Sequence, residues 1–166
     1  SELVPETTDL YPQALRSEID QWNARIHAGF NNGVYRAGFA SSQAAYDEAV
    51  ADVFDVLDEV EAQLGQTPYL TGEQFTEADL RLFPTLVRFD AAYVQAFKCA
   101  RNRLVDFPNL WAYARRLYQR PGYADTVKFD IYRQGYHSPN PNRNPCGIVA
   151  VGPKNDWRAP HNRDAA

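Results

Sequence analysis

The sequence lacks the patterns that mark proteins of membranes, nucleic acids and metals. No apolar run reaches the roughly 18 residues that a membrane helix needs, and no basic stripe with interleaved aromatic residues indicates a nucleic-acid surface. The few histidines, His27, His137 and His161, are too scattered to predict a metal site. We therefore expect no membrane, nucleic acid or metal among the partners of this chain.

Cysteine is scarce, and its spacing excludes the common redox and zinc motifs. Cys99 and Cys146 are the only two cysteines, and free thiols in a reducing cytoplasm are their simplest interpretation, with one disulfide between them as the alternative. The opening residues Ser1–Glu6 do not resemble a signal peptide, which also favours the cytoplasm. Cys99 should be structural, because it follows a predicted helix end and reactive thiols favour helix N-termini.

The usual motifs of a self-sufficient active site are missing as well. The chain has no Gly-x-Ser-x-Gly elbow, no glycine-rich phosphate loop and no His-Glu-x-x-His pair. Acidic residues crowd the segment 47–61, where a solvated acidic face is a better interpretation than a catalytic cluster. The sequence therefore predicts no catalytic residue within this chain.

What the sequence does have is apolar residues at helical spacing. With 166 residues, 45% of them hydrophobic and 13% aromatic, the chain can bury the core of one domain. Asn31-Asn32-Gly33 should stop or bend the first helix, Ser41 or Ser42 should cap the second, and Pro84 should kink the third. The predicted helices cover residues 8–30, 41–65, 76–97, 106–120 and 123–129.

A change of composition near Gly135 predicts the end of the helical part. Prolines, asparagines and glycines follow without any helical period, and no stretch of the chain supports a strand. The fold class is therefore predicted as all-α, a helical bundle over residues 1–134 with an irregular coil arm over residues 135–166 packed on it.

The segment Phe75–Leu80 predicts the start of a central, buried helix. Thr76 can cap this helix through its hydroxyl group, and Asp79 can accept a hydrogen bond from the Thr76 backbone in return. Phe75 and Leu80 are placed to form a hydrophobic staple over the same turn. Asp79 is therefore interpreted as a structural residue and not as a general acid or base. The inner face of the helix is predicted to include Leu80, Phe83, Val87, Asp90 or Ala91, Val94 and Phe97.

Two of the ten tyrosines stand at unusual positions. Tyr35 follows the predicted break at Asn31–Gly33, and Tyr136 begins the predicted coil arm. A tyrosine can stack its ring on a flat ligand and can donate or accept a hydrogen bond through its hydroxyl group. Ordinary packing with a satisfied hydroxyl group is the alternative for both residues.

Several long strings resemble a known family. Phe75–Asp79 resembles the capping box and staple in the helical domain of glutathione transferases. Longer strings narrow the resemblance to the glutathionyl-hydroquinone reductases, also called xi-class glutathione transferases. These strings are Leu15–Asn23, Asn31–Ala40, Tyr46–Val50, Thr76–Asp90, Phe97–Cys99 and Pro108–Trp111. The resemblance spans nearly the whole chain and implies the C-terminal helical domain of that family.

The resemblance also implies a mechanism that is divided between two domains. Family members carry a catalytic cysteine and the glutathione site in an N-terminal thioredoxin-like domain, and no such domain is expected in this chain. The cysteine thiolate attacks the sulfur of a glutathionyl-hydroquinone, hydroquinone leaves, and a second glutathione resolves the mixed disulfide. By motif position, Tyr35 and Tyr136 would contact the quinol hydroxyl groups, with Tyr132 as a weaker third candidate. A homodimer is also implied.

A non-catalytic, protein-binding helical module of transferase type is the second hypothesis. The two hypotheses differ in what they expect of Tyr35 and Tyr136. The reductase hypothesis places both hydroxyl groups in one shared cleft, whereas the docking hypothesis is favoured if they lie far apart or are buried with bonded hydroxyl groups.

Overall fold

The computed structural model describes residues 8–163 and contains helices, turns, irregular segments and two isolated β-bridges in that range, but no β-strand, which confirms the all-α prediction. None of the helices in this range is long and apolar enough to cross a membrane. The α-helices are α1 (Arg16–Ile26), α2 (Gly33–Gly38), α3 (Gln43–Leu64), α4 (Glu77–Arg88), α5 (Val94–Ala96), α6 (Pro108–Tyr118), α7 (Tyr123–Thr126) and α8 (Phe129–Tyr136). Two short 3₁₀ turns (Gln13–Leu15 and Leu104–Asp106) and two π turns (His27–Asn31 and Phe89–Tyr93) complete the order.

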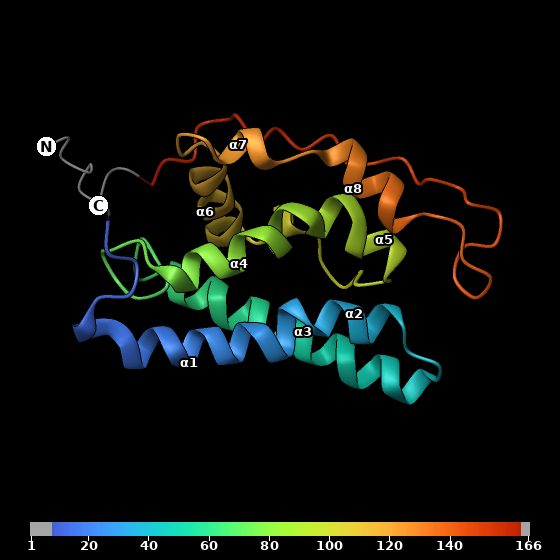
Figure 1. Ribbon diagram of the computed structural model, residues 1–166, viewed down its shortest axis with the longest axis horizontal. Coiled ribbons are helices and arrows are strands. Elements are labelled where there is room, and N and C mark those ends of the chain that lie inside the picture. The colour runs from blue at the N-terminus through green and yellow to red at the C-terminus, as the bar shows by residue number, and fades with distance from the viewer. Residues whose placement is uncertain (1–7, 164–166) are drawn as a thin grey trace, which may run out of the picture.

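The helices are arranged around one apolar core. Figure 1 shows α1 and α2 end to end beside α3, with α4 and α5 crossing the middle and with α7, α8 and the C-terminal segment on the opposite side. Helix α3 contacts α2 and α6, and α8 contacts the π turn Phe89–Tyr93. Fully buried side chains from most of these elements fill the space between them, including Ile19, Phe30, Leu57, Leu86, Leu104 and Leu117.

The sequence predicted a stop or a bend at Asn31–Gly33, and the structure has no stop there, because the helical path continues from α1 through the π turn His27–Asn31 into α2. The glycines serve close packing and not a turn. A Cβ atom added at Gly29 would lie 2.5 Å from Cγ2 of Val56, and one at Gly33 would lie 2.9 Å from Cγ2 of Val53. Helix α3 can therefore lie directly against the backbone of the first helical segment.

The predicted helix over residues 76–97 is divided into α4, the π turn Phe89–Tyr93 and α5. Pro84 lies inside α4, and the change from α to π hydrogen bonding comes after it, at Phe89. A π turn inserts an extra residue into the helix and rotates every following side chain relative to an ideal α-helix. This rotation determines which side chain of the segment faces the core near its end.

Asp79 is the polar centre of the fold and forms the expected capping box with Thr76. Its fully buried carboxylate accepts hydrogen bonds from the backbone N–H groups of Leu70 (3.1 Å) and Thr76 (2.8 Å), from the Thr76 hydroxyl group (3.3 Å) and from the Tyr113 hydroxyl group (2.7 Å). Burial raises the pKa of Asp79, and these bonds oppose that shift. Asp79 thereby joins the loop before α4 to α4 and α6.

Phe75 and Leu80 differ in burial. Phe75 is buried and packs edge-on against the rings of Tyr69 and Tyr123. Leu80 is 40% exposed, so its assignment to the inner face of α4 is wrong. The burial of Phe75 is explained by the two aromatic neighbours and needs no staple with Leu80.

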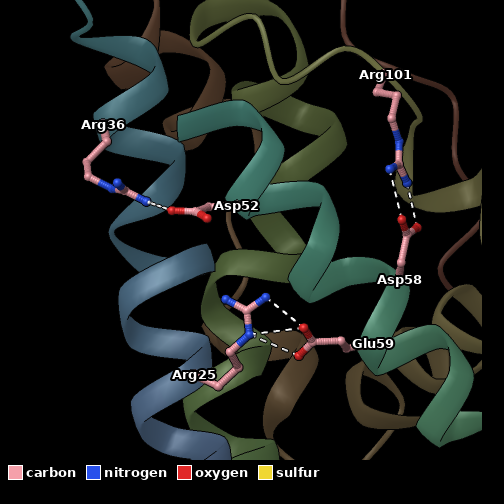
Figure 2. A network of polar contacts seen from close by, with 6 residues as sticks. All are labelled: Arg25, Arg36, Asp52, Asp58, Glu59 and Arg101. Carbon is pink, nitrogen blue, oxygen red and sulfur yellow. Dashed lines mark hydrogen bonds and ion pairs between the residues drawn. The ribbon is translucent and has the colours of Figure 1, made fainter. Parts of the chain in front are cut away.

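The acidic face of α3 is not simply solvated. Figure 2 shows three arginines from other segments that reach this helix. The ion pairs are Arg25–Glu59 at 2.7 Å, Arg36–Asp52 at 2.5 Å and Arg101–Asp58 at 2.5 Å. All six side chains are about a third exposed or more, so each pair stabilises the fold only weakly, by an amount on the order of 0–1 kcal/mol. The three pairs join α3 to α1, to α2 and to the segment after α5.

Glu61 of α3 has a different role from its acidic neighbours. Its carboxylate accepts hydrogen bonds from the backbone N–H groups of Asn109 (3.0 Å) and Leu110 (2.7 Å), in the first turn of α6. These N–H groups have no partner within their own helix, and the helix dipole favours a negative charge at that end. Glu61 therefore caps α6 from a neighbouring helix.

The C-terminal segment is irregular, as predicted, but α8 continues to Tyr136, so the predicted boundary at residue 135 falls inside this helix. Trp157 is buried against the rings of Trp111, Tyr118 and Phe129. Further on, Nη2 of Arg163 donates to the carbonyl oxygens of Leu64 (2.9 Å) and Thr67 (2.8 Å) at the end of α3. The segment therefore packs along the helices through specific contacts.

We predict that Asp79→Ala lowers the free energy of unfolding by about 3 kcal/mol, because several buried donors lose their acceptor together. Asp106→Ala is the matched control. Asp106 accepts a comparable bond from the backbone of Arg103 at 2.8 Å, but at an exposed helix start, where the loss should be at most about 1 kcal/mol. Urea denaturation of both variants measures the difference, and equal losses would contradict the central role of Asp79.

Candidate functional site

Three tyrosine hydroxyl groups from distant parts of the sequence meet at one point. The hydroxyl oxygens of Tyr35 and Tyr136 are 2.7 Å apart, those of Tyr93 and Tyr136 are 2.9 Å apart, and those of Tyr35 and Tyr93 are 3.5 Å apart. Tyr35 comes from α2, Tyr93 from the π turn and Tyr136 from the end of α8. We call these three residues the phenol cluster.

The ring of Phe97 contacts the rings of all three members of the phenol cluster, and we call it the platform of the cluster. Its centroid lies 5.3 Å from those of Tyr35 and Tyr93 and 5.6 Å from that of Tyr136. Phe97 in turn lies against Gly38, where an added Cβ would come within 2.3 Å of the ring. Gly38 is therefore required for the ring of Phe97, and with it the phenol cluster, to approach α2 closely.

The three phenols differ in their access to solvent. Tyr93 is only 2% exposed, whereas Tyr35 is 39% exposed and opens the cluster to the outside. Burial raises the pKa of Tyr93, and the hydrogen bonds with Tyr136 and Tyr35 raise it further. Burial also raises the pKa of Tyr136, with a further contribution from the hydrogen bond with Tyr35. These two phenols therefore keep their protons at neutral pH and can act as hydrogen-bond donors.

Comparison with known proteins agrees with the strings found in the sequence. A family model described as glutathione S-transferase, C-terminal domain, matches residues 43–116. The glutathionyl-hydroquinone reductase YqjG of Escherichia coli is 53% identical over 156 residues, which are 94% of this chain and 48% of YqjG. The glutathionyl-hydroquinone reductase PcpF of Sphingobium chlorophenolicum is 48% identical over 145 residues, which are 87% of this chain and 46% of PcpF.

Solved structures give the same result. The glutathione-bound structure of YqjG matches with a TM-score of 0.94 at 52% identity and covers 96% of this chain and 52% of that one. A xi-class glutathione transferase from Natrialba magadii matches with a TM-score of 0.93 at 46% identity and covers 98% of this chain and 50% of that one. The chain belongs to the xi class of glutathione transferases. It spans about half the length of the curated relatives that it matches.

The structure of this xi-class chain brings together two of the three tyrosines named from the sequence. Tyr35 and Tyr136 share a hydrogen bond, but the hydroxyl group of Tyr132 donates to the carbonyl oxygen of Thr126 at 3.2 Å, away from the phenol cluster. The ring of Tyr132 is covered by the guanidinium group of Arg88, 4.3 Å from the ring centroid. The geometry therefore gives no support to Tyr132 as a third contact.

Tyr93 is the member of the phenol cluster that the sequence did not reveal. If the α-helical spacing of Phe83 and Val87 continued, Val94 would lie on the predicted inner face of the helix. Tyr93 would then lie outside that face. The π turn Phe89–Tyr93 shifts this phase, so Tyr93 becomes fully buried while Val94 is only partly buried. Phe97, four positions after Tyr93, was the one residue in the sequence that indicated a buried face near Tyr93.

Asp90, another buried titratable group of the xi-class chain, has structural partners. Asp90 accepts hydrogen bonds from the backbone of Leu104 (2.6 Å) and from the side chain of Asn155 (2.8 Å), and burial raises its pKa. It borders a cavity of about 220 Å³ beside Trp157 whose lining includes no member of the phenol cluster. Within residues 8–163, no group of three His, Cys, Asp or Glu side chains is arranged to hold a metal ion.

Neither cysteine forms the disulfide considered as an alternative, because both are free thiols. Cys99 is fully buried, and burial raises the pKa of its thiol to about 12. This agrees with a structural role, because the reactive form of cysteine is the thiolate. Cys146 is exposed on the C-terminal segment.

We predict that a native-state alkylation experiment distinguishes the two thiols. Iodoacetamide at pH 8 should label Cys146 within minutes and leave Cys99 unlabelled, because Cys99 is both inaccessible and protonated at that pH. Peptide mass spectrometry reads out each site, and unfolding in guanidinium should make both react. Rapid native labelling of Cys99 would contradict its assignment as a buried structural thiol.

We further predict that Gly38→Val disrupts the phenol cluster, because its branched side chain would overlap the ring of Phe97. An overpacked side chain of this kind typically costs about 1–3 kcal/mol. Gly135→Ala is the matched control. Gly135 lies in α8 with nothing within 4 Å of an added Cβ, so this change should be neutral or slightly stabilising.

Thermal unfolding measures the stability of both glycine variants, and near-ultraviolet circular dichroism reports the packing of the aromatic rings. If Gly38→Val keeps the stability and the near-ultraviolet spectrum of the parent chain, Gly38 does not hold the platform in place.

Proposed function

We propose that this chain forms the hydroquinone-binding part of a glutathionyl-hydroquinone reductase. The observation that carries the proposal is the phenol cluster, in which three hydroxyl groups lie within 3.5 Å of one another and one of the three side chains is open to solvent. A hydroquinone has two hydroxyl groups on a flat ring, and the cluster offers hydrogen bonds to such oxygens beside aromatic faces.

The phenols would act by positioning the quinol and by serving as proton donors. Tyr136 and Tyr93 keep their hydroxyl protons at neutral pH, because burial raises their pKa values. When the carbon–sulfur bond of a glutathionyl-hydroquinone breaks, its electrons remain on the ring, which then takes up a proton. A phenol hydroxyl at the pocket wall can donate to the ring oxygen that carries the developing charge.

The sulfur chemistry would belong to a thioredoxin-like domain of the complete protein. A cysteine thiolate there would attack the glutathionyl sulfur and form a mixed disulfide, and a second glutathione would resolve it. The net reaction converts one glutathionyl-hydroquinone and one glutathione into hydroquinone and glutathione disulfide. Cys99 cannot replace this thiolate, because it is buried and its pKa is raised to about 12.

The remaining parts of the proposal follow from the same assignment. Glutathione would be bound mainly by that other domain, the helical bundle of residues 1–134 would pack against it, and the C-terminal arm from residue 135 would flank the quinol. The complete protein would be a cytoplasmic homodimer. The alternative of a non-catalytic docking module expects Tyr35 and Tyr136 to lie far apart or to be buried with bonded hydroxyl groups. Their hydroxyl groups are bonded to each other, but the two residues lie together and Tyr35 is 39% exposed, which favours the reductase.

We predict that Tyr35→Phe and Tyr136→Phe in the complete protein each lower kcat/KM for a glutathionyl-hydroquinone by roughly tenfold, the effect of one lost hydrogen bond at the reacting ring. Tyr132→Phe is the matched control, because it removes a hydroxyl group one helical turn before Tyr136 and outside the cluster. Steady-state kinetics and thermal unfolding should be measured together. If kcat/KM is unchanged in both Tyr35→Phe and Tyr136→Phe, the phenol cluster is not part of the substrate site.

The isolated chain provides a second test. The 166-residue chain alone should show no turnover of a glutathionyl-hydroquinone in the presence of glutathione. Steady turnover by this chain would mean that one of its own thiols is the nucleophile. A mass measurement on the protein from its native source tells whether a thioredoxin-like domain is attached to it.

A further inference from the structure

Arg143 carries a positive charge that no acidic side chain in the described part of the chain balances. Its guanidinium carbon lies 4.1 Å from the ring centroid of Phe39 and 5.4 Å from that of Phe97, and these stacking contacts hold it in place. Within residues 8–163 no carboxylate pairs with it, and its Nε atom is buried without a hydrogen-bond acceptor. Because buried N–H groups are normally paired, this one is available to an acceptor on a bound molecule.

Lys98 places a second cation beside Arg143. Its backbone has a φ of 59°, in the left-handed region, and its carbonyl oxygen accepts a hydrogen bond from the Tyr46 hydroxyl group at 2.7 Å. The exposed ammonium group has no carboxylate partner within the described part of the chain. Lys98 and Arg143 both line two adjoining cavities of about 190 and 380 Å³.

His137 contributes an unpaired polar atom to the smaller cavity. This side chain is only 6% exposed, and its Nδ1 lies 2.9 Å from the carbonyl oxygen of Arg133. A carbonyl oxygen only accepts, so Nδ1 must carry the hydrogen atom, and Nε2 of the neutral ring is then an acceptor. Nε2 is buried and has no partner. It can accept a hydrogen bond from a hydroxyl group of a bound molecule.

The smaller cavity adjoins the phenol cluster. Tyr136 lines it together with Lys98, His137 and Arg143. The ring of Phe97 connects the two sites, because it contacts both the guanidinium group of Arg143 and the rings of the phenol cluster. A quinol ring bound at the phenol cluster could therefore extend its substituents toward Lys98 and Arg143.

We propose that this cavity, which we call the cation pocket, binds a carboxylate carried on the ring of the hydroquinone. The inference rests on the proposed function and deepens it, because it names the substrate class as acidic hydroquinones. Arg143 and Lys98 donate to the carboxylate, and a hydroxyl group of the same molecule donates to Nε2 of His137. Hydrogen bonds between charged groups are stronger than those between neutral ones, so the carboxylate should strengthen binding about tenfold.

Binding of two probes to the 166-residue chain, measured by isothermal titration calorimetry, tests the inference. The probes are 2,5-dihydroxyphenylacetate, which carries a carboxylate, and methylhydroquinone, which does not. The acidic probe should bind about tenfold more tightly. Arg143→Gln should abolish this preference and leave the affinity for methylhydroquinone unchanged, whereas Arg143→Lys should retain most of it. Arg158→Gln is the matched control, because it removes one exposed arginine of the same C-terminal segment, and it should preserve the preference.

Each other outcome has one interpretation. Equal affinities for the two probes overturn the cation pocket and leave the proposed function in place, whereas no binding of either probe overturns both. Loss of affinity for both probes in Arg143→Gln means that Arg143 supports the ring platform and not a carboxylate, which overturns the inference. Reduced glutathione is the other source of a carboxylate. If it displaces the acidic probe as effectively as methylhydroquinone does, the pocket belongs to glutathione and the ring assignment is overturned.

Discussion

The contact between the backbone of Gly38 and the ring of Phe97 is the constraint on which the site depends. The two residues belong to segments far apart in the sequence, and no side chain larger than hydrogen fits at Gly38 without displacing the ring. Because the ring lies so close to α2, it can contact Tyr35 from that helix, Tyr93 from the π turn and Tyr136 from α8. The same ring also contacts Arg143. One close approach therefore positions both the phenol cluster and the cation pocket.

The rest of the fold holds the elements around this contact in place. Asp79 joins the loop before α4 to α4 and α6, and Glu61 caps α6 from α3. Gly29 and Gly33 let α3 pack directly against the helix that ends in α2. Asp79, Asp90 and Glu61 carry buried or partly buried charge, and backbone N–H groups donate to each of the three carboxylates. The buried polar groups thus join helices to one another. At the exposed rim of the site, Lys98 and Arg143 have no carboxylate partner within the described residues.

Local signals in the sequence predicted the parts of the fold that depend on a few neighbouring residues. Ser42 caps α3 through its hydroxyl group, Gly65 ends that helix, and Pro108 starts α6. The sequence failed where packing between distant segments decides the outcome. Asn31–Gly33 has the composition of a helix stop, but the close approach of α3 requires glycine there for a different reason.

The same distinction between local sequence signals and long-range packing applies to the candidate site. Tyr35 and Tyr136 were predicted through the family resemblance, and their hydroxyl groups lie together. Tyr93 was missed because a π turn shifts the helical phase, and nothing in the local sequence requires a π turn at Phe89. Tyr132 was named as a weaker third candidate, but its hydroxyl group donates to the carbonyl oxygen of Thr126. The unpaired state of Arg143 and His137 depends on the path of the whole C-terminal segment, which no local pattern predicts.

The phenol cluster is proposed here as the wall of a hydroquinone site. A crystal structure of this chain soaked with methylhydroquinone would test that role most directly. We expect electron density for the quinol on the exposed side of Tyr35, with one quinol oxygen about 2.7–3.0 Å from the hydroxyl group of Tyr35 or Tyr136. Quinol density that lies only in the cavity beside Asp90 and Trp157, with the phenol cluster unchanged, would contradict it.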